Sequence, residues 1–202
     1  MKGLLLKDII NLKQQAKIFL IAAILYIVIS FMNQDSSIFS VFAVVFTIMV
    51  PMTAFAYDEK AKWNRYALTM PVSRYDIVLS KYLLSFLFAV ISLFFAFLVS
   101  FSVTHHFHES LTSSLTLFLI GLTLSAFVLP IFFKFGVEKG RFVLLALVLV
   151  PSFAVMIGSK LQIPLPDQAT ISILLSIVPF ACILCILISI LVSIHIYQGK
   201  EF

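Results

Sequence analysis

The sequence predicts an all-α polytopic membrane protein with six transmembrane helices and with its N and C termini both cytoplasmic. Six long runs contain no Asp, Glu, Lys or Arg, and a hydrocarbon core needs about 20 helical residues to cross, or somewhat fewer with snorkelling flanks. Of the 14 Lys and Arg residues, thirteen lie in alternate gaps between the runs. Composition agrees, with 62% hydrophobic and 11% charged residues. Helices are favoured over a barrel because the alternating pattern of barrel strands is missing.

The charged gaps also predict the orientation. Four basic residues precede the first run, five lie between the second and third, three lie between the fourth and fifth, and one lies in the tail. Only Lys160 occupies an outer gap. Cytoplasmic loops retain the excess of Lys and Arg, so an even number of helices preserves this alternation and an odd number would not. The same bias, with attraction to anionic lipid, explains the net charge of +5, and no nucleic-acid partner is expected.

The amphipathic pattern of residues 3–15 predicts a helix that lies at the membrane surface before the first span. Apolar residues fall on one helical face and polar residues on the other, as amphipathic interfacial helices require. The apolar set is Leu5, Leu6, Ile9, Ile10 and Leu12, and the polar set is Lys7, Asp8, Asn11, Gln14 and Gln15. The alternative is a frayed basic leader.

A single transmembrane domain is expected to occupy residues 1–202. Its predicted spans are 17–33, 37–57, 78–104, 111–133, 141–159 and 172–197. The last uncharged run is too long for one simple span and carries Pro179. It predicts either a re-entrant piece followed by a span or one kinked, tilted helix, and we favour an outer stretch that leads into a span ending near His195.

Several classes of function are disfavoured. The sequence has no G-x-x-x-x-G-K-[ST] loop to cradle nucleotide phosphates, so this chain is not expected to hydrolyse ATP or to be an enzyme. The uncharged runs argue against proton-coupled or ion-coupled transport, which places ionisable groups at mid-membrane. The H-E-x-x-H of metalloproteases is also missing.

Two groups of potential metal ligands have ordinary structural explanations. Cys182 and Cys185 form a C-x-x-C inside a span, where inert packing is expected. The loop with His105, His106 and His108 could form a weak metal site or sense pH, but an interfacial loop without either role is favoured.

The segment 57–81 is the longest and most charged loop. Trp63, Tyr66, Ala67 and Met70 share one face at helical spacing, and Pro71 ends this element. Ser73 is predicted to cap the next helix at Asp76. From spacing alone, two readings have equal weight: a helix that offers aromatic residues to a partner, or a connector that rests on lipid headgroups.

This segment resembles the membrane subunits of ABC exporters of the ABC-2 permease family. The matching residues are an acidic pair after the second span, Asp58 and Glu59, then Leu68-Thr69-Met70-Pro71-Val72-Ser73-Arg74, followed by Ile77-Val78 and Lys81. The likeness extends along the chain, because the family also has an N-terminal interfacial helix and six spans with cytoplasmic ends. The short outer gap at 160–167 implies that the large extracellular domain of some relatives is absent.

The resemblance implies that residues 58–70 form a coupling helix that docks on a separate ATPase subunit. The residues expected to bind this partner are Asp58, Glu59, Lys62, Trp63, Arg65, Tyr66, Met70, Pro71 and Arg74. Two ATPase subunits would carry ATP and magnesium, and this chain would bind no cofactor itself. A second permease chain, identical or a sister, would complete the transporter in the bacterial plasma membrane.

Among small members, the chain is most similar to permeases that export amphipathic peptides, such as the phenol-soluble modulin exporters. A pathway lined by Phe, Leu, Ser and Thr suits amphipathic or lipid-like cargo, since a compact ion would find no compensating charge. The alternative is a membrane scaffold or sensor that does not transport and uses the same loop to dock a partner or lipid.

Overall fold

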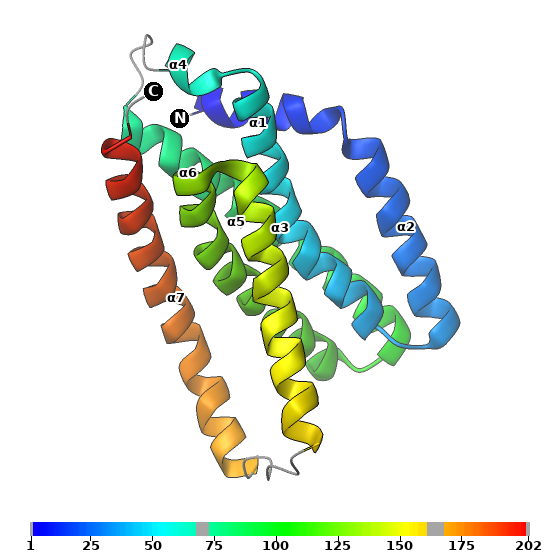
Figure 1. Ribbon diagram of the computed structural model, residues 1–202. Coiled ribbons are helices and arrows are strands. Elements are labelled where there is room, and N and C mark those ends of the chain that lie inside the picture. Colours follow the sequence, from blue (N-terminus) through cyan, green and yellow to red (C-terminus); the bar gives the residue numbers. More distant parts are fainter. Residues whose placement is uncertain (1, 68–72, 161–167, 201–202) are drawn as a thin grey trace.

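The computed structural model describes residues 2–67, 73–160 and 168–200, and every regular element within these ranges is a helix (Figure 1). The helices are α1 (Lys2–Lys13), α2 (Ala16–Asn33), α3 (Ser37–Lys60), α4 (Trp63–Ala67), α5 (Arg74–Thr104), α6 (Phe107–Lys160) and α7 (Gln168–Gln198). By length and composition, five described helices could cross a membrane, namely α2, α3, α5, α6 and α7. The predicted class, an all-α polytopic membrane protein, is confirmed.

The long helix α6 is a helical hairpin. Gly136 interrupts it with φ 80° and ψ 179°, and a Cβ placed on Gly140 would collide with the ring of Phe132. Residues eight apart in a straight helix are about 12 Å apart along its axis, so this contact requires the chain to turn back. Figure 1 shows the arms 107–135 and 137–160 running in opposite directions. The predicted spans 111–133 and 141–159 fall on these two arms.

Both termini, α4 and the turn at Gly136 lie at one end of the bundle, at the top of Figure 1. We call this the N/C end. The α2–α3 and α5–α6 connections lie at the other end. This placement agrees with termini on one side of the membrane, as the charge pattern predicts.

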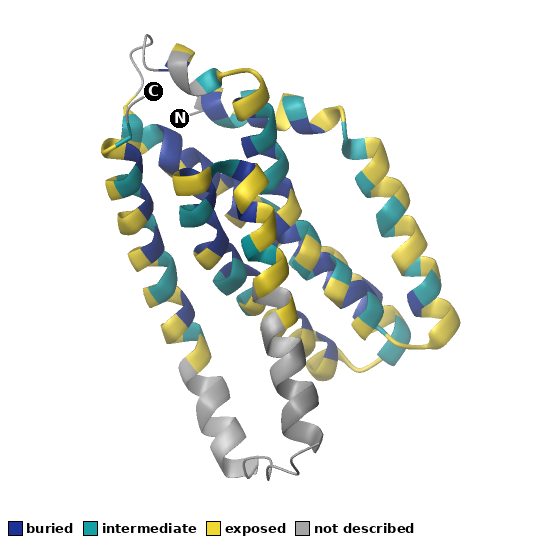
Figure 2. Ribbon diagram, viewed as in Figure 1, coloured by how far each residue is buried: buried dark blue, intermediate teal, exposed yellow. Residues whose placement is uncertain are grey.

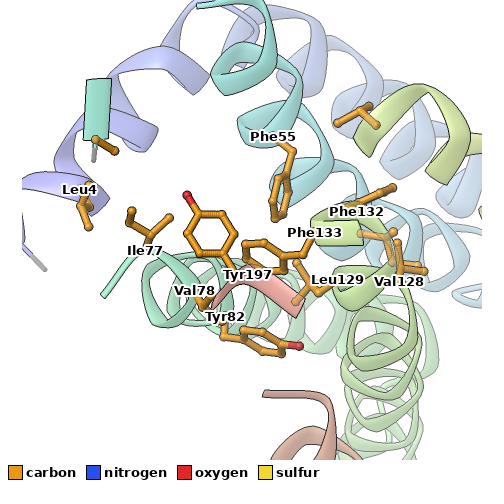
Figure 3. Close-up of a cluster of buried hydrophobic side chains, with 13 residues drawn as sticks. Leu4, Phe55, Ile77, Val78, Tyr82, Val128, Leu129, Phe132, Phe133 and Tyr197 are labelled. Atoms are coloured by element: carbon orange, nitrogen blue, oxygen red, sulfur yellow. The ribbon is translucent and has the colours of Figure 1, made fainter. Parts of the chain in front are cut away.

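In the bundle, α3, α5 and α6 pack against one another, and α7 packs against α5 and α6. Its largest apolar cluster gathers near the N/C end and joins Phe55, Phe132, Phe133 and Tyr197 (Figure 3). The rings of Phe55 and Phe133 meet edge to face with centroids 4.8 Å apart, a geometry that aromatic pairs prefer.

Helix α2 stands at the edge of the bundle and contacts mainly α3. Ser30 is its one buried residue, and Figure 2 shows the rest of the helix exposed or half-buried. Two aromatic contacts hold it, Phe19 with Phe46 and Tyr26 with Phe42. Since almost all of its side chains are apolar, this exposed helix is suited to face lipid or another membrane helix.

The helix ends differ in places from the sequence expectations. Helix α5 begins at Arg74, directly after its Ser73 cap and one turn before the predicted membrane span at 78: Ser73 Oγ accepts a hydrogen bond from the Asp76 N–H at 3.1 Å. This predicted cap is confirmed. Helix α7 continues from Gln168 to Gln198 with Pro179 inside it. The structure therefore has the single long helix in place of a separate outer stretch and span.

Helix α1 forms over the predicted residues, but its faces are reversed at one key position. Leu4, Asp8 and Leu12 are the buried residues of α1, one turn apart, whereas Leu6 and Ile10 are 59% and 57% exposed. The sequence pattern predicts Asp8 on the polar face of this helix, and this prediction is wrong, because Asp8 is 1% exposed. The reason is a buried cation on α5 that Asp8 contacts.

Candidate functional site

The predicted coupling segment lies at the N/C end but is divided into two elements. Asp58 and Glu59 belong to the last turn of α3, which ends at Lys60. Lys62 then takes a left-handed conformation with φ 50°, and α4 begins at Trp63. The continuous helix expected over 58–70 is therefore interrupted within its first turns.

Two residues of α4 hold this short helix against the bundle. Ala67 has no exposed surface, and the half-buried Trp63 packs against the main apolar cluster. The ammonium group of Lys7, on α1, lies 4.2 Å from the centroid of the Trp63 ring. A cation over an indole face is an attractive contact. Trp63 therefore faces into the protein and links α4 to α1.

Beneath α4 lies a cluster of four charged side chains, which we call the ion cluster: Lys7, Asp8, Asp58 and Lys81. Lys81 Nζ is 2.6 Å from Asp58 Oδ2 and 2.9 Å from Asp8 Oδ2. Lys7 Nζ is 2.5 Å from Asp58 Oδ1 and 3.2 Å from Asp8 Oδ1. Each cation therefore contacts both carboxylates, and the cluster as a whole is neutral.

The ion cluster is largely removed from solvent. Asp8, Lys81 and Asp58 are 1%, 2% and 6% exposed. Buried charges need well-placed opposite charges, because desolvation of each ion costs several kcal/mol. The cluster joins α1, α3 and α5, and through Lys7 it also contacts the Trp63 ring of α4. A displacement of α4 or α1 would therefore move the charged side chains that join α1, α3 and α5.

Glu59 points to a different neighbour. Its Oε1 accepts a hydrogen bond from the Val137 N–H at 2.8 Å, at the start of the second arm of α6. A carboxylate at a helix N-terminus is stabilised by the free N–H groups and the helix dipole. A Cβ on Gly136 would lie 2.5 Å from the same Glu59 oxygen. The last turn of α3 thus caps the α6 hairpin at its turn.

Two cations close helix ends at this side of the bundle. The Arg74 guanidinium donates to the carbonyl oxygens of Tyr197, at 3.2 Å, and of Gln198, at the end of α7. Lys200 Nζ donates to the Phe133 carbonyl at 3.1 Å, near the end of the first α6 arm. Positive charge suits these carbonyl-rich helix ends. Arg74 therefore joins α5 to α7 within the chain.

The structure divides the residues predicted to bind a partner into those that contact the rest of the chain, those that face outward and those outside the described residues. Asp58, Glu59, Trp63 and Arg74 make contacts within the chain. Lys62 and Tyr66 face outward, and Tyr66 is 62% exposed. Met70, Pro71 and the side chain of Arg65 lie outside the described residues. The outward surface of α4 and its preceding turn is the candidate docking surface.

Sequence reasoning did not find Lys7, Asp8 and Lys81 as parts of this site. One signal was available: Asp8 has the helical spacing of Leu4 and Leu12, so it shares their face. The other groups noted in the sequence remain separate from the site. Cys182 is buried with its Sγ 3.7 Å from the Leu119 carbonyl oxygen, and no three potential metal ligands gather among the residues that the structure describes.

Comparison with known proteins identifies the family. The family model described as ABC-2 family transporter protein matches residues 3–198. No curated protein and no solved structure gave a significant match. The matched region runs from α1 through the Gln198 end of α7, and so includes the whole ion cluster and α4. The chain belongs to the ABC-2 family of transporter proteins.

Proposed function

We propose that this chain is the permease subunit of an ATP-driven exporter and that α4 docks a separate ATPase subunit. Family membership supports a membrane component of an ABC transporter that works with an ATPase partner. One observation carries the assignment to α4: the helix presents Tyr66 outward while Trp63 faces inward to Lys7 of the ion cluster. One short element can therefore receive a partner on one side and act on the membrane helices on the other.

The proposed mechanism is rigid-body gating. Closure of the ATPase subunits on ATP and magnesium would displace α4, and the ion cluster would pass this displacement to α1, α3 and α5 as a unit. Closely packed helices transmit a small displacement to their neighbours because the protein interior is dense and hard to compress. In this cycle ATP and magnesium bind to the ATPase subunits.

The proposed topology has six membrane crossings with the N/C end cytoplasmic. The α6 hairpin supports the count, since its two arms supply two crossings and α2, α3, α5 and α7 supply one each. Exposed Lys60, Lys62, Lys134, Lys139 and Arg141 at the N/C end support the orientation through the positive-inside rule. The membrane is proposed to be the bacterial plasma membrane.

The proposed assembly contains two permease chains and two ATPase subunits, and the second permease is either a like chain or a sister. The exposed apolar side chains of α2 and α7 are available to a second chain as well as to lipid. The proposed cargo is an amphipathic peptide or another amphipathic molecule. The six uncharged runs support this choice of cargo, because a hydrophilic ion would find no compensating charge within the membrane.

Co-purification tests the proposal. The tagged chain, extracted from its native membrane in mild detergent, is expected to bring down a P-loop ATPase in equal amount. The double variant Lys62→Ala with Tyr66→Ala is expected to weaken that association about tenfold or more, since exposed aromatic residues dominate many interfaces. His108→Ala, an exposed residue at the opposite end, is the control and should bind like the unmodified chain.

A membrane scaffold or sensor is the competing function, and the same experiment separates the two. Recovery of the chain without any ATPase would favour the scaffold. If the ATPase is recovered equally with the double variant and the unmodified chain, the docking surface lies elsewhere. Reconstituted vesicles with amphipathic peptides then test the cargo, and peptides that leave ATP hydrolysis unchanged would contradict it.

A further inference from the structure

The last turn of α3 carries two adjacent carboxylates that contact different parts of the bundle. Asp58 belongs to the ion cluster, and its two cations come from α1 and α5. The Glu59 Oε1 atom instead accepts a hydrogen bond from the Val137 N–H at 2.8 Å, where the second arm of α6 begins. Asp58 therefore links the end of α3 to α1 and α5, and Glu59 links it to the second arm of α6.

Glu59 is also bonded to the turn that leads into α4. The Lys62 N–H donates to the Glu59 carbonyl oxygen at 3.1 Å, and α4 begins at the next residue, Trp63. The main chain of Glu59 is thus bonded to the residue that precedes α4, and its side chain is bonded to α6. A displacement of α4 therefore reaches the second arm of α6 through one residue.

The two arms of α6 differ in how firmly they are packed near their turn. Among residues 137–146 of the second arm, only Val137 and Gly140 are buried. Phe142 and Leu145 on this arm are 74% and 55% exposed. A segment with few buried contacts moves more readily than the core. The first arm contributes four buried residues to the main apolar cluster, namely Val128, Leu129, Phe132 and Phe133 (Figure 3).

We propose that Glu59 is a positioning residue that transmits the displacement of α4 to the second arm of α6, which pivots on the first arm at Gly136. Gly136 has φ 80° and ψ 179°, and glycine has the widest range of allowed backbone angles. The Glu59 carboxylate lies at the N-terminus of the second arm, where the free N–H groups favour a negative charge. This inference rests on the proposed function, because it requires an ATPase subunit that moves α4.

Direct contact of Glu59 with the ATPase subunit, which the family resemblance predicts, fits these observations less well. A Cβ on Gly136 would lie 2.5 Å from Glu59 Oε1, so the carboxylate packs directly against the backbone of the α6 turn. Val137 is 2% exposed. If Glu59 turned toward a partner, the Val137 N–H would lose its acceptor at a position with little access to water, which is costly.

The test uses the full-length chain with its co-purified ATPase subunit in nanodiscs, in a background with Cys182 and Cys185 replaced by Ala. Spin labels at Phe127→Cys on the first arm and Leu145→Cys on the second arm, both exposed positions, report the distance between the arms by pulsed electron paramagnetic resonance. A non-hydrolysable ATP analogue with magnesium is expected to shift this distance. Glu59→Ala is expected to bind the same amount of ATPase and to lose most of the shift.

Two further variants and a second measurement separate positioning from general damage. Glu59→Gln is expected to keep the shift, because its amide oxygen accepts the same hydrogen bond. Glu138→Ala, which removes an exposed carboxylate from the same turn, is the matched control and should also keep it. Without the ATPase, hydrogen exchange at the Val137 amide should be about three- to tenfold faster in Glu59→Ala, the range that one hydrogen bond provides. Glu59→Gln should slow this exchange again.

A full shift in Glu59→Ala with the ATPase bound would overturn the role of Glu59, as would an unchanged exchange rate at Val137. Loss of ATPase binding in Glu59→Ala would overturn it as well, because Glu59 would then belong to the docking surface. An unchanged distance between the arms with Glu59 intact and the ATPase bound would overturn the pivot at Gly136. Recovery of the chain without any ATPase is a distinct result, because it overturns the proposed function itself.

Discussion

Lys81 is shared by two carboxylates from different helices, Asp8 of α1 and Asp58 of α3. It lies 2.6 Å from Asp58 and 2.9 Å from Asp8, and it is 2% exposed. These charges are desolvated, so the loss of any one partner leaves an uncompensated buried charge and destabilises the protein. Lys7 differs from the other three in being partly exposed, at 22% of its side-chain surface. The cluster thus has an interior, formed by Lys81, and an accessible edge, formed by Lys7.

Replacing Lys81 with Met should therefore be far more damaging than replacing an exposed lysine. Lys81→Met leaves two carboxylates with one partly exposed cation, and removal of one partner from a buried pair costs about 3–5 kcal/mol. Thermal unfolding in detergent measures the loss. Lys139→Met, at an exposed position of the α6 turn, should unfold like the unmodified chain.

A second variant distinguishes lost charge balance from lost packing. Lys81→Met combined with Asp8→Asn leaves the Lys7–Asp58 pair and makes the cluster neutral again, so it should recover a large part of the stability, since neutral replacement of buried ion groups is often tolerated. If Lys81→Met alone unfolds like the unmodified chain, then the carboxylates do not depend on Lys81.

At the residue level the sequence predicted the Ser73 cap but not the ion cluster. The cap is local: a serine three residues before an acidic residue at a helix start is sufficient to predict it. The ion cluster joins residues from three helices, and Lys7 and Asp58, for example, are 51 positions apart. In a single sequence, such a pair looks like two charges on a solvated surface, so the pattern predicts an outward Asp8 and the family resemblance predicts that Asp58 binds a partner.

At the level of single elements, the hairpin in α6 depends on one glycine. Gly136 has φ 80° and ψ 179°, a conformation that is essentially restricted to glycine. Its missing side chain also gives the Glu59 carboxylate room to reach the Val137 N–H. Position 136 therefore needs glycine both for its backbone conformation and for the space that the Glu59 carboxylate occupies.

Gly136→Ala should therefore destabilise the protein by about 1–3 kcal/mol from backbone strain, with a further loss if Glu59 is displaced. Gly3→Ala is the matched control, because a Cβ at Gly3 meets nothing within 4 Å and alanine favours the helix. Unfolding temperatures of the two variants provide the measurement. A Gly136→Ala variant as stable as the Gly3→Ala variant would contradict the hairpin geometry described for α6.

The sequence indicated this hairpin more clearly than it indicated α4. Lys134, Lys139 and Arg141 interrupt the apolar pattern, and they mark the turn between two apolar arms. By contrast, nothing local marks the break at Lys62, which is neither glycine nor asparagine. Tertiary contacts decide it, because burial of Ala67 and the contact of Trp63 with Lys7 draw α4 back onto the bundle.

At the scale of the whole molecule, α4 has one side for partner binding and another for contact with the membrane helices, whereas the sequence predicted Tyr66 and Trp63 on a single face. Tyr66 faces outward and Trp63 faces Lys7. Under the proposed function, loss of Tyr66 should weaken ATPase binding, whereas loss of Trp63 should weaken the transmission of its movement. The two effects are separable by measuring binding and transport on the same variants.

Trp63→Ala is accordingly expected to keep ATPase affinity close to that of the unmodified chain and to lower ATP-driven transport roughly fivefold, within the range of coupling energies between sites. Reconstituted vesicles measure both quantities. A variant that loses binding and transport in parallel would place Trp63 in the docking surface itself. Trp63→Phe should restore part of the transport, because a phenyl ring also attracts the Lys7 ammonium group.

The orientation of the whole molecule rests on the distribution of charge, and cysteine labelling can test it. Thirteen of the 14 Lys and Arg residues fall on the gaps assigned to the cytoplasm. Helix propensity and hydropathy predict where helices lie, but only the loop charges predict which side each end faces. The exposed Lys139 follows the α6 turn, which lies at the N/C end, and the exposed His106 belongs to the α5–α6 connection, which lies at the opposite end.

In a background with Cys182 and Cys185 replaced by Ala, a membrane-impermeant maleimide should therefore label His106→Cys in intact cells. Lys139→Cys should react only after the membrane is permeabilised, because the positive N/C end is retained in the cytoplasm during insertion. Labelling of both positions in intact cells would contradict a membrane crossing by the first arm of α6, which lies between them. Labelling of Lys139→Cys alone would invert the protein and place α4 out of reach of any cytoplasmic ATPase.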